Sequence, residues 1–312
     1  MPAFFDYLVA MNFALSPARN RAAANLAPYA AMLGAILTLV IGTSLAKQLF
    51  PLVGAEATSG YRVGFAAILL LLIWRPWRTR LATRDLLAVA QYGAVMGLMN
   101  LSFYMALRTI PLGVAIAIEF LGPLTVALLL SRRLVHFGAV GLAVAGLALL
   151  LPIRATGSTL DPTGVAYALM AAICWGLYIV LGKRASHLHS GHAVSLGMAT
   201  AALIVVPVGI YSAGADFFTL HFMLVGLGAA ILSSAIPYSL EMVALKHIPP
   251  RNFGVLVSIE PAVGAIAGVL LLGEMLSAVQ WLAIMLVVGA SVVTVATGTA
   301  SEAVDDDMLA QP

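Results

Sequence analysis

The sequence predicts an all-α polytopic membrane protein whose ten transmembrane helices form two inverted repeats of five. Three observations support this prediction: the composition, the number of apolar windows, and a motif that occurs once in each half. Of the 312 residues, 62% are hydrophobic and only 9% are charged, whereas charged residues make up about a quarter of an ordinary soluble domain. The small net charge of +3 gives no support to nucleic-acid binding.

Ten windows are long and apolar enough to become spanning helices, which need about 20 mostly apolar residues each. They cover residues 27-47, 56-74, 86-107, 111-131, 134-153, 163-182, 193-213, 221-245, 252-272 and 277-298. The links between them are short, so the sequence leaves no room for a soluble domain. The lipid bilayer is therefore the expected environment of almost the whole chain.

The basic residues predict the orientation in the membrane. With a cytoplasmic N-terminus, only four of the sixteen Lys and Arg residues fall on or toward the outside, namely Lys47, Arg62, Arg108 and Arg154. Cytoplasmic loops carry an excess of basic residues, so both termini are expected in the cytoplasm. Residues 1-26 are expected to form a cytoplasmic lead-in, and residues 299-312 an acidic cytoplasmic tail.

The repeated motif lies around the fourth and ninth windows. Arg108 matches Lys246 and Pro123 matches Pro261. The further matches are Ala106 with Ala244, Leu107 with Leu245, and Ile110 with Ile248. Five windows lie on either side of residue 157, and an odd number per half forces the second half to insert upside down. We therefore expect two five-helix repeats, 27-155 and 156-298, with a site at the membrane midplane between them.

Three acidic residues, Glu119, Glu241 and Glu260, lie well inside the windows. Ionisable residues are costly in a membrane and mark solute or proton pathways. Because buried carboxyls suit a group that takes up a proton on one side and releases it on the other, we expect Glu119 and Glu260 to bind an ammonium group or to couple to protons. Glu241, nearer the cytoplasmic end, is the weaker candidate. Three prolines are expected to break or kink the same helices: Pro123, Pro237 and Pro261.

Two basic residues in the first half could hold a carboxylate. Lys47 shares a helix face with Thr43, and it could instead extend to the outer headgroups. Arg62 lies between two glycines at a helix-packing spacing. Either base could also neutralise a buried glutamate in a purely architectural pair. Five further side chains are expected either to line a cavity or to serve helix packing: Asn100, Tyr104, Trp175, Tyr178 and Tyr238.

Other chemistries receive little support. His187, His189 and His192 lie in a short loop without an accompanying Cys or acid, so no metal site is expected there. The single cysteine, Cys174, excludes an intrachain disulfide. Neither H-E-x-x-H nor G-x-S-x-G occurs, so we expect no enzyme and no cofactor. A channel remains an alternative that transport kinetics would distinguish.

A run of motifs resembles one transporter superfamily. The motifs are S-L-A-K-Q-L-F-P-L-V-G-A at the end of the first window, P-L-G-V-A-I-A-I-E-F-L-G-P in the fourth, the S-R-R that follows, P-Y-S-L-E-M in the eighth and S-I-E-P in the ninth. Together they resemble the drug/metabolite transporter superfamily, in its EamA-type group, and most closely the threonine/homoserine exporters of bacterial inner membranes. The likeness runs from about Leu39 to Val295.

That resemblance implies export of small neutral amino acids such as threonine and homoserine across the inner membrane. It further implies proton antiport with alternating access through a central cavity. The transporter would work as a monomer or a weak homodimer. An exporter of another metabolite or of a cationic drug is the alternative, since the same fold serves many solutes.

Overall fold

The protein is helical throughout the part of the chain that the structure describes. This computed structural model describes residues 17–79, 82–129, 134–150, 160–184, 190–237 and 256–309, with the single residues 188, 240 and 244. No β-strand occurs among these residues. The predicted all-α class is confirmed.

The helices follow the predicted windows in order. The first half contains α2 (Pro17–Lys47), α3 (Phe50–Trp74), the short 3-10 helix η2 (Pro76–Arg78), α4 (Thr83–Ala106), α5 (Leu112–Glu119), α6 (Leu121–Leu129) and α7 (Leu134–Leu150). The second half contains α8 (Pro162–Arg184), α9 (Ser190–Ala213), the 3-10 helix η3 (Gly214–Phe218), α10 (Leu220–Ala230), the π-helix η4 (Ile231–Ala235), α13 (Glu260–Leu272) and α14 (Ala278–Leu309). Each of the ten windows contains at least one of these helices. In the described part of the chain, five helical segments are long and apolar enough to cross a membrane.

Two helices extend beyond the windows that predicted them. Helix α2 begins at Pro17, inside the segment expected to be a lead-in, and α14 continues to Leu309, inside the segment expected to be a tail. Both extensions contain alanines, which favour helix, and neither has an internal proline to stop it. The apolar windows mark where a helix can lie in lipid, and they do not mark where the helix ends.

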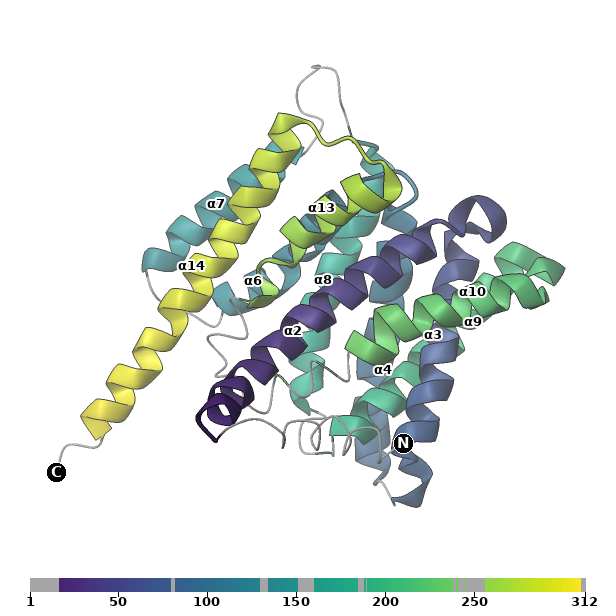
Figure 1. The fold of residues 1–312 in the computed structure, drawn as a ribbon, viewed down its shortest axis with the longest axis horizontal. Helices are drawn as coiled ribbons and strands as arrows, with labels where there is room; N and C mark the ends of the chain where they lie inside the picture. The colour runs from purple at the N-terminus through teal and green to yellow at the C-terminus, as the bar shows by residue number, and fades with distance from the viewer. Residues whose placement is uncertain are drawn as a thin grey trace.

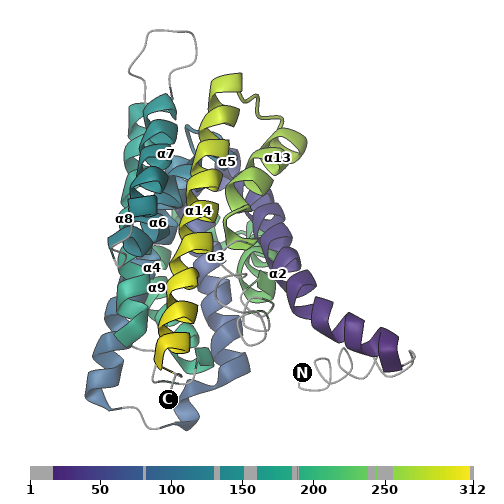
Figure 2. The same ribbon diagram turned by 90° about the vertical axis from the view of Figure 1, so that its left-hand side faces the viewer.

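Corresponding helices of the two halves pack against one another. Helix α3 contacts α9, α5 contacts α13, and α7 contacts α14. Helix α4, in the third window of the first half, contacts α8, in the first window of the second half. In return α2, in the first window of the first half, contacts α10 and η4, in the third window of the second half. Figures 1 and 2 both show α7 and α14 side by side. This exchange of partners is the pattern expected of two repeats related by a twofold axis in the membrane plane.

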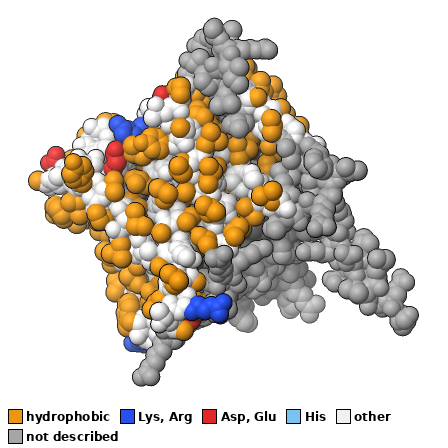
Figure 3. All heavy atoms as spheres, turned by 180° about the vertical axis from the view of Figure 1, so that it is seen from behind, with side chains coloured by type: hydrophobic (Ala, Val, Ile, Leu, Met, Phe, Trp, Pro, Cys, Tyr) orange, Lys and Arg blue, Asp and Glu red, His pale blue; other side chains and the backbone are white. Residues whose placement is uncertain are grey.

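Helix α5 lies at the centre of the bundle, and all eight of its residues are buried. Small residues let its neighbours approach closely: a Cβ added at Gly113 would collide with the backbone of Ala265 on α13. The outer surface is the reverse of a soluble protein's. Hydrophobic side chains cover the face seen in Figure 3, and charged side chains gather at its margins. The apolar surface is therefore suited to lipid, and the tightest packing lies along the contacts between the halves.

Both halves contain a helix break just before the matched proline. In the first half α5 ends at Glu119 and α6 begins at Leu121. In the second half Ser258 and Ile259 form a turn before α13 begins at Glu260. Pro123 cannot donate a hydrogen bond to the carbonyl four residues back, which belongs to Glu119. Pro261 instead occupies the first turn of α13, where a missing N–H costs nothing.

Candidate functional site

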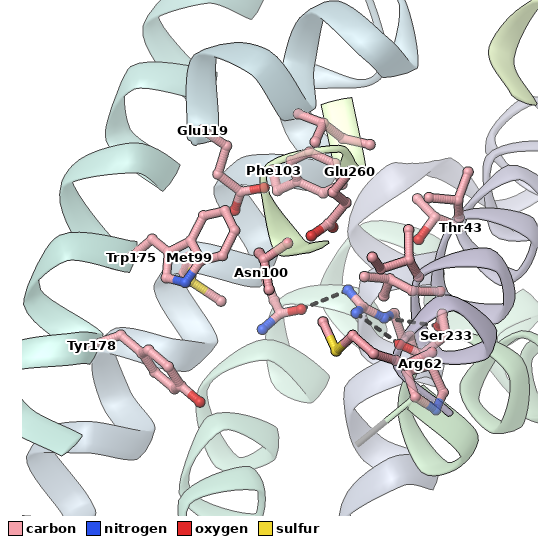
Figure 4. A pocket seen from close by; sticks show the side chains of 18 residues that line it. Thr43, Arg62, Met99, Asn100, Phe103, Glu119, Trp175, Tyr178, Ser233 and Glu260 are labelled. Atoms are coloured by element: carbon pink, nitrogen blue, oxygen red, sulfur yellow. Dashed lines mark hydrogen bonds between the residues drawn. The ribbon is translucent and has the colours of Figure 1, made fainter. Parts of the chain in front are cut away.

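A cavity of about 170 Å³ lies where the two halves meet. Helices α2, α3, α4 and α5 contribute from the first half, and α8, η4 and the start of α13 from the second. Most of its wall is apolar. The polar side chains that line it are Thr43, Arg62, Asn100, Glu119, Trp175, Tyr178, Ser233 and Glu260 (Figure 4).

Arg62 supplies the positive charge of the cavity and is only 6% exposed. Its Nη1 donates to Oδ1 of Asn100 at 2.6 Å, its Nε donates to Oγ of Ser233 at 2.9 Å, and its Nη2 donates to the Ser233 carbonyl at 3.2 Å (Figure 4). The guanidinium also lies 5.4 Å from the centre of the Tyr104 ring. No carboxylate among the described residues forms an ion pair with it. Arg62 is therefore held in place by neutral groups, and its charge acts on Glu119 in the same cavity.

Pro237 explains why the Ser233 carbonyl is available to Arg62. Proline has no N–H to donate to the carbonyl four residues back, and for Pro237 that residue is Ser233. The chain around Ser233 forms the π-helix η4, a local widening that is frequent at functional sites. The Ser233 hydroxyl donates to the Ala229 carbonyl at 2.7 Å while it accepts from Arg62. Pro237 of the second half thus helps to hold the guanidinium of Arg62, which belongs to the first half.

Two carboxyl groups face the cavity from opposite halves. Glu119 is the last residue of α5 and is 9% exposed, and Glu260 is the first residue of α13. Glu119 interacts electrostatically with Glu260 and with Arg62, and Figure 4 shows both carboxyls turned toward the cavity. Both helix breaks described above therefore place an acid at the same site.

Aromatic side chains form the wall beside Glu119. Trp175 on α8 packs edge-on against Phe120, the residue of the first break, with ring centres 5.5 Å apart. The hydroxyl of Tyr92 donates to that of Tyr178 at 2.8 Å. This wall places an indole against the residue that follows Glu119.

Lys47 lies outside the cavity, in an ion pair that joins the two halves. Its Nζ is 2.7 Å from Oε1 of Glu274 and donates to the Ile110 carbonyl at 3.2 Å. The other oxygen of Glu274 accepts from the backbone N–H of Leu112 at 2.8 Å. Of the two first-half bases, the structure therefore brings only Arg62 to the cavity. Lys47 instead pairs with Glu274, an acid that lies outside the predicted windows.

The cavity does not reach the end of the bundle that carries Lys47. Its lining on α2 extends from Met32 to Thr43 and stops one helical turn short of Lys47. Ile110 and Leu112, whose backbone groups bond to this ion pair, are both buried.

Comparison with known proteins is consistent with this architecture. Residues 162–296 match the EamA-like transporter family. Over 264 residues the chain is 46% identical to the threonine/homoserine exporter RhtA of Escherichia coli K12, covering 85% of this chain and 90% of the relative. The chain belongs to the EamA-like transporter family. The resemblance to the EamA-type group of the drug/metabolite transporter superfamily is thereby confirmed.

Other proteins similar to this EamA-like transporter include a second named exporter, an uncharacterized transporter and a solved structure. RhtA of Salmonella typhimurium LT2 is 45% identical with the same coverage. An uncharacterized transporter of Clostridium kluyveri is 28% identical over 121 residues, which are 38% of this chain and 39% of the relative. A solved crystal structure superposes with a TM-score of 0.57 at 23% identity, covering 90% of this chain and 98% of that one, and this supports the fold alone.

For this EamA-like transporter, the structure brings together most of the residues singled out from the sequence. Tyr104 lies behind the cavity wall and is fully buried. Tyr238 and Glu241 lie outside the described residues, as do His187 and His189. His192 is described, with its Nδ1 3.2 Å from the Thr79 hydroxyl. Among the described residues, no three metal-binding side chains come together.

Sequence reasoning missed Ser233 and Glu274. Ser233 could have been found as the residue four before Pro237. Glu274 follows Gly273, which ends α13 in the left-handed region at φ 66°, and its position just past the apolar window hid its role.

Proposed function

We propose that this protein exports small neutral amino acids of the threonine and homoserine type, in exchange for protons. The observation that carries the proposal is the arrangement of charge in the cavity, with Arg62 on one side and Glu119 and Glu260 on another. An amino acid is a zwitterion, so its carrier needs a cation and an anion at a short separation. The named relatives that export threonine and homoserine support this choice of solute.

Arg62 is the proposed partner of the solute's carboxylate. A guanidinium presents a planar fork of donors that matches a carboxylate. Asn100 and Ser233 hold this fork through three hydrogen bonds, so little side-chain entropy remains to be lost when a solute binds.

Glu119 and Glu260 are the proposed partners of the solute's ammonium group and of the proton. Two negative carboxylates that face one cavity repel each other, and in a low-dielectric cavity that repulsion is strong. A bound proton or a bound ammonium group relieves this repulsion, so each of them lowers the affinity of the site for the other. Competition of this kind couples export of the solute to entry of a proton. Trp175 adds an aromatic ring on which an ammonium group can lie.

The size of the cavity favours an amino acid over a drug. Pockets for drug-sized ligands occupy roughly 300–1,000 Å³, whereas this cavity is about 170 Å³. This small volume counts against the alternative of a cationic drug exporter.

The proposed transport cycle alternates between two openings of the cavity. We take the end that carries the Lys47–Glu274 pair as the closed one. From the distribution of basic residues we place that end outside the cell and both termini in the cytoplasm. The described state then accepts a solute from inside. Breaking of the Lys47–Glu274 pair would open the outer path. The bacterial inner membrane is the expected location.

Uptake of radiolabelled threonine into inverted membrane vesicles tests the proposal. An imposed pH gradient should drive accumulation in the wild type. Glu119→Gln and Glu260→Gln should each lose that accumulation. Glu56→Gln is the matched control, because Glu56 lies at the Lys47 end outside the cavity and pairs with Arg108 at 3.2 Å. Accumulation that ignores the pH gradient in the wild type would exclude proton coupling, and wild-type rates in both cavity variants would exclude these acids.

A further inference from the structure

Thr43 is a cavity residue whose hydroxyl makes no bond to a carbonyl of its own helix α2. It lies on α2, is 4% exposed, and lines the cavity. Its neighbour Gly42 packs so closely on η4 that an added Cβ would collide with the backbone at Leu232 and Ser233. The contact between α2 and η4 therefore fixes the rotation of α2 and turns Thr43 inward (Figure 4).

Hydroxyl groups on these helices usually bond to a carbonyl of the preceding turn. On α2 itself, Thr38 donates to the Gly34 carbonyl at 2.7 Å and Ser44 donates to the Val40 carbonyl at 2.9 Å. Thr43, between them, makes no such bond to α2, and its hydroxyl instead faces the cavity and the hydroxyl of Tyr104. Its position on the cavity wall points to the solute.

Tyr104 provides an independent observation at the same place. Its ring is fully buried, and its hydroxyl lies beside Thr43, Arg62 and Ser233. By geometry this hydroxyl completes no hydrogen bond with the described residues. Two hydroxyls thus lie next to the guanidinium that would hold the solute's carboxylate. Thr43 and Arg62 are therefore neighbours around the Tyr104 hydroxyl.

We propose that Thr43 recognises the side-chain hydroxyl of a hydroxylated α-amino acid and so discriminates it from apolar amino acids of the same size. The inference rests on the proposed function and adds the residue that selects the solute. In an α-amino acid a β- or γ-hydroxyl lies a few bonds from the carboxylate. With the carboxylate on Arg62, the hydroxyl reaches the neighbouring Thr43. The rest of the wall near Thr43 is apolar, including Ile36, Leu39 and Val40.

Competition measurements on purified, reconstituted transporter test this inference. Unlabelled threonine and valine compete for counterflow of labelled threonine, and valine differs by a methyl group in place of the hydroxyl. Thr43→Val keeps the side-chain volume and removes the hydroxyl. It should weaken threonine about 2- to 10-fold, the range of one hydrogen bond, and leave valine unchanged, so the threonine/valine ratio falls toward one. Thr43→Ser should keep most of the ratio.

Thr38→Val is the matched control, because it removes a hydroxyl from the same helix at a position that does not line the cavity, and it should not change the ratio. If Thr43→Val does not fold, Thr43→Ala is measured in its place. An unchanged ratio in a folded Thr43 variant would overturn the role of Thr43 while leaving the proposed function intact. A wild type without threonine counterflow would overturn the proposed function itself.

Discussion

The ion pair between Lys47 and Glu274 allows the closure of the cavity to be tested by a single substitution. Glu274→Gln removes the charge but keeps an oxygen that can accept from the Leu112 N–H. It therefore breaks the link to Lys47 with little change of shape. Since Lys47 and Glu274 come from different halves, the substitution should favour the state in which this end is open.

The exposure of the pair sets the size of the effect. The two side chains are 19% and 12% exposed. Removing one partner of a fully buried pair costs about 3–5 kcal/mol, whereas a fully exposed pair contributes about 0–1 kcal/mol. A mostly buried pair lies between, at about 2 kcal/mol, which changes an equilibrium about 30-fold.

Thiol labelling reads out this opening. Ile110 lies under the pair and is 2% exposed, so a thiol introduced by Ile110→Cys reacts only when the end opens. The measurement uses a Cys174→Ala background in detergent, with a maleimide as reagent. Glu274→Gln should raise the labelling rate by up to about 30-fold.

Glu56→Gln is the control for charge removal at the same end. It breaks the Arg108–Glu56 pair, in which the side chains are 51% and 20% exposed and both residues belong to the first half. A rise of no more than about 5-fold is expected there. Equal rates in both variants, or no rise with Glu274→Gln, would refute a role of the ion pair in holding the halves closed.

Three further predictions concern other parts of the fold. Gly113→Val should cost at least about 1–3 kcal/mol through overpacking against α13 and abolish transport, whereas Gly228→Val, where an added Cβ meets nothing within 4 Å, should be tolerated; unfolding in detergent and transport assays check both. Arg62→Lys keeps the charge but loses the fork, so threonine affinity in counterflow should fall about 10-fold or more, and wild-type affinity would contradict this. The Thr109 hydroxyl and the amides of the first turn of α8 lower the pKa of Asp161. Stability from Asp161 is therefore present above its ordinary pKa and lost as the pH falls through the lowered value, so Asp161→Asn should flatten the fall in melting temperature at acid pH, and an unchanged fall would argue against it.

Much of the fold could be predicted because membrane insertion depends on local sequence. A window of about 20 apolar residues becomes a spanning helix whatever its neighbours are. Membrane burial of a charge is costly at any position, so Arg62, Glu119 and Glu260 stood out before their surroundings were known. The helix ends were less predictable, because α2 and α14 continue past the apolar windows.

The sequence alone therefore determined the class of the protein, the order of its helices, the inverted repeat and the candidates for its charged site. Only the tertiary structure decided which base faces the acids, sending Arg62 to the cavity and pairing Lys47 with Glu274. It also placed Ser233 against Arg62, although 171 positions separate them in the chain. The physical reason is that the rotation of each helix about its axis is set by the helices of the opposite half, and no local pattern contains that contact.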